Sequence, residues 1–473
     1  MRIVLINPWN PEEEGAIYSS DYQKYQWRNA YYGLVQLATY INRHGHEAYI
    51  IDGERDLLIE ASGNPVLLLE RMRRKLLDFA PDLIGVTGMS FRYPAISRIL
   101  DMVEPLGIRA VIGGHHARGV PQSCLEEHPF LDCAFYGMAE TGLKRYMDGA
   151  RLSELPGIVF RNGSGYMMTP PETVCSMDDL PMPDWDHIDV SFYTHPCVWL
   201  HRSVNTLVRN LDTICSRGCS YSCNFCGMTG IRDNRPAWHS VERIREYLFH
   251  IRGKYGVNAT MFQDSSLGNN PEFLHELCDM FMTSGLNRGF VWNANMRANQ
   301  ITEELARLMY RAGCRMVFIG FESASDRILK AMSKGVTAEE NRECARALEK
   351  AGMPYWASFV AGYPGETEED LLATMQFAHS INPIGGGANE FNPAPGTRIF
   401  NTLMNEGKIR KPVTPEEWAE ISIISRDGAV GYGHWSSIEP ERFRDMVNLF
   451  QLILQEKLNR GMNREIPFDP PSS

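Results

Sequence analysis

The chain has 473 residues, of which 44% are hydrophobic and 22% are charged, and its formal net charge is −11. This composition supports folded cores and excludes an intrinsically disordered chain. Phosphate neutralisation needs clustered Lys and Arg, so the acidic balance predicts no nucleic-acid partner. No apolar stretch approaches the ~18 residues of a transmembrane helix, and the N-terminus does not resemble a signal peptide. We therefore expect a cytoplasmic protein with no transmembrane segment.

Residues 1–150 alternate short apolar runs with amphipathic stretches. A helix is predicted over Tyr32–His44 and ends at Gly45, since glycine often follows the last helical turn. The predicted strands are Arg2–Ile6, Ala48–Ile51, Leu83–Thr87, Ala110–Ile112 and Cys133–Tyr136. Strands separated by helices predict an α/β domain with a doubly wound parallel sheet, as in Rossmann-like folds.

Residues 151–200 differ in composition from the preceding segment and do not continue its alternation of apolar runs and amphipathic stretches. Ile158–Arg161 and Tyr166–Met168 flank Asn162-Gly163, a dipeptide typical of a hairpin turn. The Pro-rich segment 180–186 predicts an extended chain. We interpret residues 151–200 as a hairpin followed by a linker.

The alternation resumes over residues 201–410. The predicted strands are Thr206–Leu211, Ala259–Phe262, Phe290–Ala294, Met316–Ile319, Ala357–Ala361 and Gly387–Phe391. The predicted helices are Val241–Arg252, Pro271–Ser284, Thr302–Ala312, Asp326–Met332, Ala338–Ala351 and Glu366–His379. Six such units predict a partial (β/α)6 barrel. Residues 411–473 form a predicted helical C-terminal segment, with a helix over Pro440–Asn459.

Small and polar residues recur where four of the N-terminal strands end, and doubly wound sheets bind ligands at that edge. These strand ends carry Asn7, Pro8 and Trp9; Thr87, Gly88, Met89 and Ser90; Gly113, Gly114, His115 and His116; and Tyr136 and Gly137. An ordinary tight turn explains any one of the glycine pairs. Their repetition at four strand ends favours a site for a large flat ligand.

Three cysteines lie close together in one glycine-containing loop. Cys219, Cys223 and Cys226 are separated by three and then two residues, and their thiolates can converge on one iron–sulfur cluster. A cubic cluster held by three cysteines leaves one iron open for a substrate group. A structural zinc site is the alternative, but zinc prefers four ligands and no second cysteine pair follows. Cys215 is interpreted as a strand-end residue rather than a ligand.

This loop, with the aromatic Phe225 before its last cysteine, resembles that of the radical S-adenosylmethionine superfamily, and later strand ends match in order. The resemblance implies a [4Fe-4S] cluster on Cys219, Cys223 and Cys226. It also implies contacts to S-adenosylmethionine from Phe225, Gln263, Asp264, Ser265, Asn295, Arg297, Glu322 and Gly362. Family members usually carry Gly-Gly-Glu or an acidic pair where this chain has Gln263-Asp264-Ser265, so backbone carbonyls or Asp264 would have to serve. The alternative for Glu322 is a strand-end hydrogen bond, and for Arg297 a surface ion pair.

Residues 1–140 resemble the cobalamin-binding domain that precedes many radical SAM barrels, and some members keep this domain without cobalamin. The resemblance implies a cobalamin site formed by Asn7, Trp9, Thr87, Gly88, Met89, Ser90, Gly113, Gly114, His115, Tyr136, Gly137 and Glu140. The Asp-x-His-x-x-Gly signature that places a histidine on cobalt is absent, so we expect no histidine on the metal. The alternative for His115 and His116 is a hydrogen-bonded turn.

The resemblance to class B methyltransferases of this superfamily implies reductive cleavage of S-adenosylmethionine to a 5′-deoxyadenosyl radical and, with cobalamin, methylation of an unactivated carbon. The expected partners are a small-molecule or lipid-like substrate and an electron donor such as flavodoxin or ferredoxin. The protein's role is positioning and exclusion of water, and no general base is visible. The alternatives are ring formation, ring contraction or oxidation without methyl transfer; a methylthiotransferase, whose second cysteine set is not visible; and an iron–sulfur or cobalamin sensor.

Overall fold

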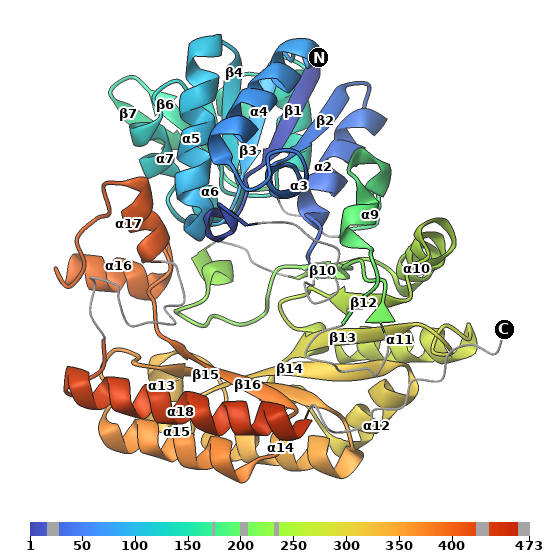
Figure 1. Ribbon diagram of the computed structural model, residues 1–473, viewed down its shortest axis with the longest axis vertical. Helices are drawn as coiled ribbons and strands as arrows, with labels where there is room; N and C mark the ends of the chain where they lie inside the picture. Colours follow the sequence, from blue (N-terminus) through green and yellow to red (C-terminus); the bar gives the residue numbers. More distant parts are fainter. Residues whose placement is uncertain (17–27, 173–175, 199–206, 231–235, 422–434, 462–473) are drawn as a thin grey trace.

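The computed structural model describes residues 1–16, 28–172, 176–198, 207–230, 236–421 and 435–461. Two α/β units face each other, the N-terminal unit in blue and teal and the second in yellow and orange (Figure 1). Thr206 and residues 422–434 and 462–473, which fall within predicted elements, lie outside the described residues. No helix in the described part of the chain is long and apolar enough to cross a membrane.

The N-terminal sheet has the strand order β2-β1-β3-β4-β5-β6-β7. Its strands are β1 Arg2–Asn7, β2 Glu47–Asp52, β3 Leu83–Thr87, β4 Arg109–Gly113, β5 Cys133–Phe135, β6 Ile158–Asn162 and β7 Gly165–Met168. Its helices are α2 Tyr32–Arg43, α3 Gly53–Ile59, α4 Pro65–Phe79, α5 Tyr93–Val103, α6 Gly114–Gly119, α7 Pro121–Glu127 and α8 Glu140–Met147. The first five strands are parallel, which confirms the predicted doubly wound sheet. The predicted hairpin is present as β6 and β7, and it extends the sheet because β6 pairs antiparallel with β5.

The burial of β1 explains its continuous apolar sequence. Ile3 and Leu5 belong to one hydrophobic cluster, whereas Val4 and Ile6 belong to another, and each is at most 2% exposed. Successive side chains of a strand point to opposite faces, and helices cover both faces of a parallel sheet. The interior of β1, residues 3–6, is therefore apolar at every position.

The second unit is built on five parallel strands in sequence order. They are β12 Ala259–Phe262, β13 Val291–Met296, β14 Cys314–Glu322, β15 Tyr355–Ala361 and β16 Gly385–Glu390. The helices are α10 Val241–Tyr255, α11 Pro271–Thr283, α12 Glu303–Arg311, α13 Asp326–Ala331, α14 Ala338–Ala351 and α15 Glu368–Ser380, followed by α16 Arg398–Asn405, α17 Pro415–Glu420 and α18 Pro440–Gly461. The partial barrel and the helical C-terminal segment are confirmed. The boundaries at residues 150, 200 and 410 stay a prediction.

The expected first barrel strand, Thr206–Leu211, differs from the prediction. β9 covers only Leu207–Val208 and pairs antiparallel with β8, Cys197–Val198. The chain then meets β12 through single bridges at Asn210 and Thr213. Polar side chains interrupt this segment, and Thr213 Oγ1 contacts Thr260 Oγ1 at 2.7 Å. The first barrel position is thus an irregular segment leading into the cysteine loop.

Helix α18 covers the outer barrel strand β16 (Figure 1). A Cβ on Gly386 would meet Ala357 O at 2.7 Å, and one on Gly385 would meet the Trp356 ring at 2.8 Å. The glycines therefore allow close packing of β16 against its neighbours. Gln451 of α18 donates a hydrogen bond to Ala388 O, and the helix protects an edge that would otherwise be open.

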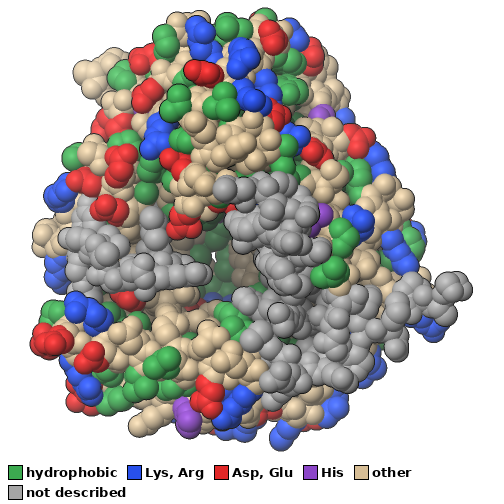
Figure 2. All heavy atoms as spheres, in the orientation of Figure 1, with side chains coloured by type: hydrophobic (Ala, Val, Ile, Leu, Met, Phe, Trp, Pro, Cys, Tyr) green, Lys and Arg blue, Asp and Glu red, His purple; other side chains and the backbone are tan. Residues whose placement is uncertain are grey.

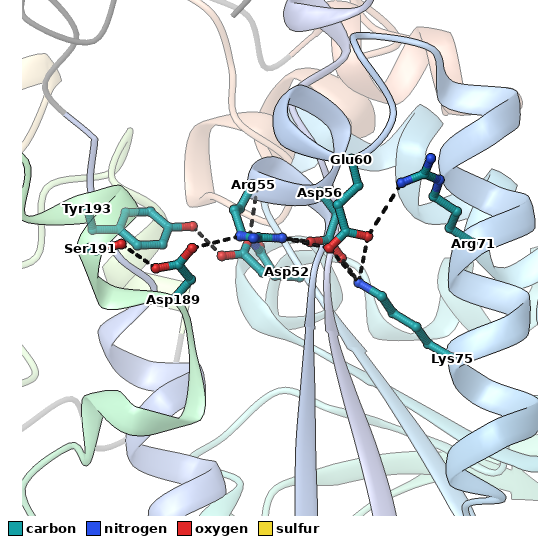
Figure 3. A network of polar contacts seen from close by, with 10 residues as sticks. Asp52, Arg55, Asp56, Glu60, Arg71, Lys75, Asp189, Ser191 and Tyr193 are labelled. Atoms are coloured by element: carbon teal, nitrogen blue, oxygen red, sulfur yellow. Dashed lines mark hydrogen bonds and ion pairs between the residues drawn. The ribbon is translucent and has the colours of Figure 1, made fainter. Parts of the chain in front are cut away.

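The linker is fastened to the N-terminal sheet through α9, Val190–Tyr193. Tyr193 OH donates to Asp52 Oδ2 at 2.6 Å, and Arg55 Nε lies 3.1 Å from Asp189 Oδ2. Figure 3 shows these two pairs continuing into an ionic network on α3 and α4 that includes Asp56, Glu60, Arg71 and Lys75.

Trp185 connects the linker to the barrel. Its indole is fully buried, and Nε1 donates to Tyr247 OH on α10 at 2.9 Å. Tyr32 of α2 packs edge-on against both rings. The linker therefore binds both units and fixes the edge at which they face each other.

Candidate active site

A cavity of ≈ 780 Å³ lies between the carboxyl ends of the N-terminal strands and the start of the barrel. Figure 2 shows the molecular surface hollowed between the two units. The predicted cobalamin residues that line the cavity are Thr87, Gly113, Gly114, His115, Tyr136, Gly137 and Glu140. The predicted S-adenosylmethionine residues that line it are Gln263, Asp264, Ser265 and Asn295. Two sites predicted from separate halves of the sequence thus open into one space.

Gly114 shapes the N-terminal wall of this cavity. Its φ is +86°, which favours glycine, and a Cβ there would meet Gly88 N at 2.7 Å and would lie still closer to Thr87 Oγ1. The neighbouring wall positions Gly85, Gly113 and Gly137 also carry no side chain. The wall consequently presents backbone, against which a flat macrocycle can lie closely.

Five predicted cobalamin residues do not line the cavity. Asn7 is 1% exposed and donates to Asp52 Oδ1 at 3.2 Å, and Trp9 is fully buried and donates to Glu14 Oε1 at 2.9 Å. The others are Gly88, Met89 and Ser90. Asn7 and Trp9 fix the turn after β1 and belong to its packing.

The two adjacent histidines occupy different surroundings. His116 is 1% exposed, stacks on Tyr93 with ring centroids 3.9 Å apart, and lies 3.0 Å from Ser90 Oγ. Burial lowers the pKa of His116 to about 3, and burial also lowers the pKa of His115. Both rings are therefore neutral near pH 7, His116 within the fold and His115 on the cavity wall.

Asn224 anchors the cysteine loop. Its backbone N donates to Met332 O at 3.0 Å and its Nδ2 donates to Ala331 O at 2.8 Å. Its Oδ1 accepts from Tyr363 OH at 2.9 Å, and its carbonyl accepts from Ile399 N at 3.1 Å. One asparagine thus fixes the loop to the end of α13, to the loop after β15 and to α16.

Hydrogen-bond donors lie beside two of the three sulfurs. Arg297 Nη1 lies 3.5 Å from Cys223 Sγ, and Asn269 Nδ2 lies 3.9 Å from Cys219 Sγ. Burial, with the Cys223 and Cys219 sulfurs nearby, raises the pKa of the Cys226 thiol. Metal coordination offsets the cost of deprotonating this thiol, because the metal replaces the proton on sulfur. Within the described residues no three His, Cys, Asp or Glu side chains are disposed to hold a single metal ion. Three sulfurs of one loop beside cationic and amide donors fit an anionic iron–sulfur cluster.

Asp264 ties the barrel to the strand that precedes the cysteine loop. It is 1% exposed, and its carboxylate accepts from Cys215 N at 3.1 Å and from Ser216 Oγ at 2.5 Å. Burial raises the pKa of Asp264 to about 6. Its carbonyl accepts from Asn295 Nδ2 at 3.1 Å. Cys215 itself is fully buried, in agreement with its interpretation as a strand-end residue.

Arg297 and Glu322 lie behind the cavity wall rather than on it. Arg297 stacks on Tyr221, with its guanidinium carbon 3.6 Å from the ring centroid, and also donates to Lys334 O. Glu322 forms an ion pair of 2.6 Å with Lys334 Nζ and has a φ of +62°. The surface ion pair considered for Arg297 is wrong, because the side chain is buried against the cysteine loop.

Gly362 and Phe225 also lie outside the cavity lining. Gly362 has a φ of +83°, and a Cβ there would meet Phe443 of α18 at 2.7 Å. Its N–H donates to Glu366 Oε2 at 2.6 Å, and burial raises the pKa of this carboxyl to about 7. Phe225 packs, partly buried, against a hydrophobic cluster that contains residues of both units.

Two arginines at the cavity were not predicted. Arg217 Nη1 pairs with Glu140 Oε1 at 2.6 Å, and Arg217 Nη2 donates to Gln36 Oε1, so it joins the barrel to the N-terminal sheet. Arg118 of α6 reaches Met228 after the cysteine loop. The sequence could have indicated both arginines, because Arg118 closely follows the predicted cobalamin residue His115 and Arg217 closely precedes the cluster residue Cys219.

A barrel with a three-cysteine loop at its mouth, opposed to the ligand edge of a doubly wound sheet, defines a class of two-cofactor enzymes. Residues 213–378 match the radical SAM superfamily and residues 30–146 match the B12 binding domain. The chain belongs to the radical SAM superfamily and carries a B12-binding domain ahead of its radical SAM domain. It is a radical SAM enzyme, and these domains imply a [4Fe-4S] cluster, S-adenosylmethionine and cobalamin.

Known proteins resemble the chain over most of its length. An uncharacterized methyltransferase of Pyrococcus horikoshii is 28% identical over 376 residues, covering 78% of this chain and 77% of the relative. Cytidylyl-2-hydroxyethylphosphonate methyltransferase of Streptomyces wedmorensis is 25% identical over 432 residues, covering 81% and 79%. The methyltransferase TsrM of Kitasatospora setae, solved with cobalamin and a [4Fe-4S] cluster, has the same fold, with a TM-score of 0.70 and 16% identity over 96% of this chain and 88% of TsrM.

Proposed function

We propose that the protein is a cobalamin-dependent radical SAM methyltransferase that methylates an unactivated carbon of a small or lipid-like substrate. The observation that carries this proposal is the shared cavity of ≈ 780 Å³, because it brings the glycine wall of the N-terminal sheet opposite the barrel residues Gln263, Asp264, Ser265 and Asn295. A methyl group and a substrate carbon must meet in one enclosed space for transfer between them.

The cofactors supply the radical and the methyl group, and the residues of the chain supply position. The cluster would be held by Cys219, Cys223 and Cys226 in a loop that Asn224 and Asp264 fix from two sides. On the opposite wall, we propose that Thr87, Gly113, Gly114, His115, Tyr136, Gly137 and Glu140 contact cobalamin. His115 would lie on this wall as a neutral imidazole, because burial lowers its pKa.

The S-adenosylmethionine contacts divide into direct and indirect ones. Gln263, Ser265 and Asn295 line the cavity, and the Asp264 carbonyl lies beside them, so these groups would receive the amino acid part of the molecule. Three other residues would support the site from behind. Arg297 would act through the cysteine loop, Glu322 through Lys334, and Gly362 through Phe443.

We further propose that the protein works in the cytoplasm with an electron donor such as flavodoxin or ferredoxin. The support is chemical, since a cluster that must be reduced suits a reducing compartment. Reduction of the cluster by such a donor, followed by S-adenosylmethionine cleavage, tests this partner. Cleavage that occurs with a chemical reductant but with neither flavodoxin nor ferredoxin would contradict it.

The test is anaerobic production with cobalamin supplied, followed by incubation with a small-molecule extract and S-adenosylmethionine carrying a deuterated methyl group. We expect corrin and iron–sulfur absorption in the same protein, and a product that has gained the deuterated methyl group. Formation of 5′-deoxyadenosine with no label in any product would instead support ring formation, ring contraction or oxidation. A protein with iron but no corrin would contradict the methyltransferase proposal.

A further inference from the structure

Arg118 is a cation at the cavity for which the proposed reaction has no assigned use. Its Nη2 lies 3.5 Å from Met228 O and its Nη1 lies 3.6 Å from Met228 Sδ, while its Nε is buried without a hydrogen-bond partner. No carboxylate among the described residues forms an ion pair with it, and burial lowers the pKa of Arg118 to about 10. Removing a charge from water without a counter-charge is costly. A guanidinium that stays charged at this position therefore requires a nearby anion.

The backbone around Arg118 holds it against the barrel. A Cβ on the next residue, Gly119, would meet Pro395 C at 3.0 Å and would approach Pro395 O more closely. A Cβ on Gly396 would meet Gly119 C at 2.6 Å. Helix α6 therefore touches the loop after β16 backbone to backbone, and this contact fixes the position of the backbone that carries Arg118.

The cysteine loop is the negative group that Arg118 faces. Met228 follows Cys226 by two positions in η7, Gly227–Gly230, and α6 packs against this turn. The other cavity arginine, Arg217, is already neutralised by Glu140. Arg297 stands beside Cys223 from within the barrel, so Arg118 is the corresponding cation from the N-terminal unit.

We propose that Arg118 is a positioning residue through which the N-terminal domain stabilises the reduced, more negative state of the cluster on Cys219, Cys223 and Cys226. This inference rests on the proposed function for the presence of the cluster, but not for methyl transfer. Reduction adds one negative charge to a group already carrying three thiolates. A fixed guanidinium at low dielectric lowers the free energy of that added charge.

The test is the midpoint potential of the cluster in the full-length, reconstituted holoenzyme, measured by titration with electron paramagnetic resonance detection in the absence of substrate. Arg118→Gln should make reduction about tenfold less favourable, equivalent to ~59 mV for one electron. Arg118→Lys keeps the charge and should recover most of that shift. Arg109→Gln is the matched control, because Arg109 lies in an exposed ion pair at the start of β4, the strand that precedes α6, and it should leave the midpoint unchanged.

An unchanged midpoint in Arg118→Gln would overturn the inference. If S-adenosylmethionine binding weakened at an unchanged midpoint, the anion that Arg118 serves would be a bound ligand. Partial loss of iron does not obscure the result, because a midpoint does not depend on the fraction of protein that holds a cluster. Complete loss of the cluster from both the Gln and the Lys variants would also contradict a role of charge. Failure of methyl transfer leaves this measurement untouched, whereas a wild-type protein without a cluster would refute the proposed function itself.

Discussion

The two walls of the cavity are built in opposite ways. On the barrel side, polar side chains hold one another and the cysteine loop: Asp264 binds the Cys215 and Ser216 groups, and Arg297 lies against Cys223. On the N-terminal side, glycines at the strand ends expose backbone between side chains such as Tyr136. Among these glycines, Gly114 is the position where a Cβ is excluded most strongly.

This difference separates the effects that substitutions should have. A loop held by specific hydrogen bonds is damaged by removing a side chain, because its partners stay buried and unsatisfied. A glycine position such as Gly114 is damaged by adding a side chain, because the added atoms collide with the neighbouring strand end and distort the surface that the ligand would meet. Cluster and cobalamin binding should therefore be lost independently.

The largest effect is expected for the cluster cysteines. Replacing Cys219, Cys223 and Cys226 by Ala should abolish the cluster and all formation of 5′-deoxyadenosine, measured by iron content and by chromatography of the products. Cys215→Ala is the control: its side chain is buried away from the cavity, so cluster and cleavage should persist. 5′-Deoxyadenosine from the triple variant would refute the cluster assignment.

Gly114→Ala should sharpen the comparison from the other wall. The added methyl group would lie 2.7 Å from Gly88 N at a φ of +86°, so the strand ends must move apart. Corrin absorption after reconstitution should fall strongly while iron content stays at the wild-type level. Gly107→Ala provides a control with positive φ but open surroundings, and it should retain corrin. Equal retention in both variants would show that the glycine wall does not contact cobalamin.

A smaller effect is expected for the loop anchor. Asn224→Ala removes the side-chain contacts to Tyr363 OH and Ala331 O, each worth about 1 kcal/mol and more where a buried partner stays unsatisfied. Iron should be lost several-fold faster to a chelator than from the wild-type protein. Tyr363→Phe removes one of these contacts and should show an intermediate rate. Identical rates in all three proteins would contradict the anchoring role.

The smallest effect concerns pH. Burial raises the pKa of Asp212 to about 7, although Asn210 and Gln263 donate to its carboxylate. A raised carboxyl pKa contributes stability below its unfolded value near 4, and this contribution is lost as pH rises through 7. Urea unfolding of the apoprotein should give a smaller decline between pH 5 and pH 8 in Asp212→Asn than in the wild type. Parallel declines would place the titrating group elsewhere, such as Glu366, whose pKa burial also raises.

The sequence predicted the parts of the fold that periodicity controls. Apolar runs such as Leu83–Thr87 and amphipathic stretches such as Ala338–Ala351 have the predicted bounds, because each is buried on a regular pattern. The segment near Thr206–Leu211 could not be predicted, since its pairing depends on single long-range bridges to β12.

The candidate site was likewise predicted only in part. Strand-end position predicted which segments reach the cavity, but not which side chain at a strand end turns inward. Asn7, the last residue of β1, and Trp9, two residues beyond it, are buried in the fold rather than turned toward the cavity. Arg118 and Arg217 were missed because their role depends on how the two units meet, and no local pattern encodes that contact.

The most direct measurement of the central claim is the absorption spectrum of the full-length protein purified anaerobically after growth with cobalamin, with iron and corrin quantified in the same sample. The shared cavity predicts equal amounts of corrin and cluster in the wild type, loss of corrin alone in Gly114→Ala, and loss of cluster alone in the triple cysteine variant. Wild-type protein with a full cluster and no corrin would contradict the account.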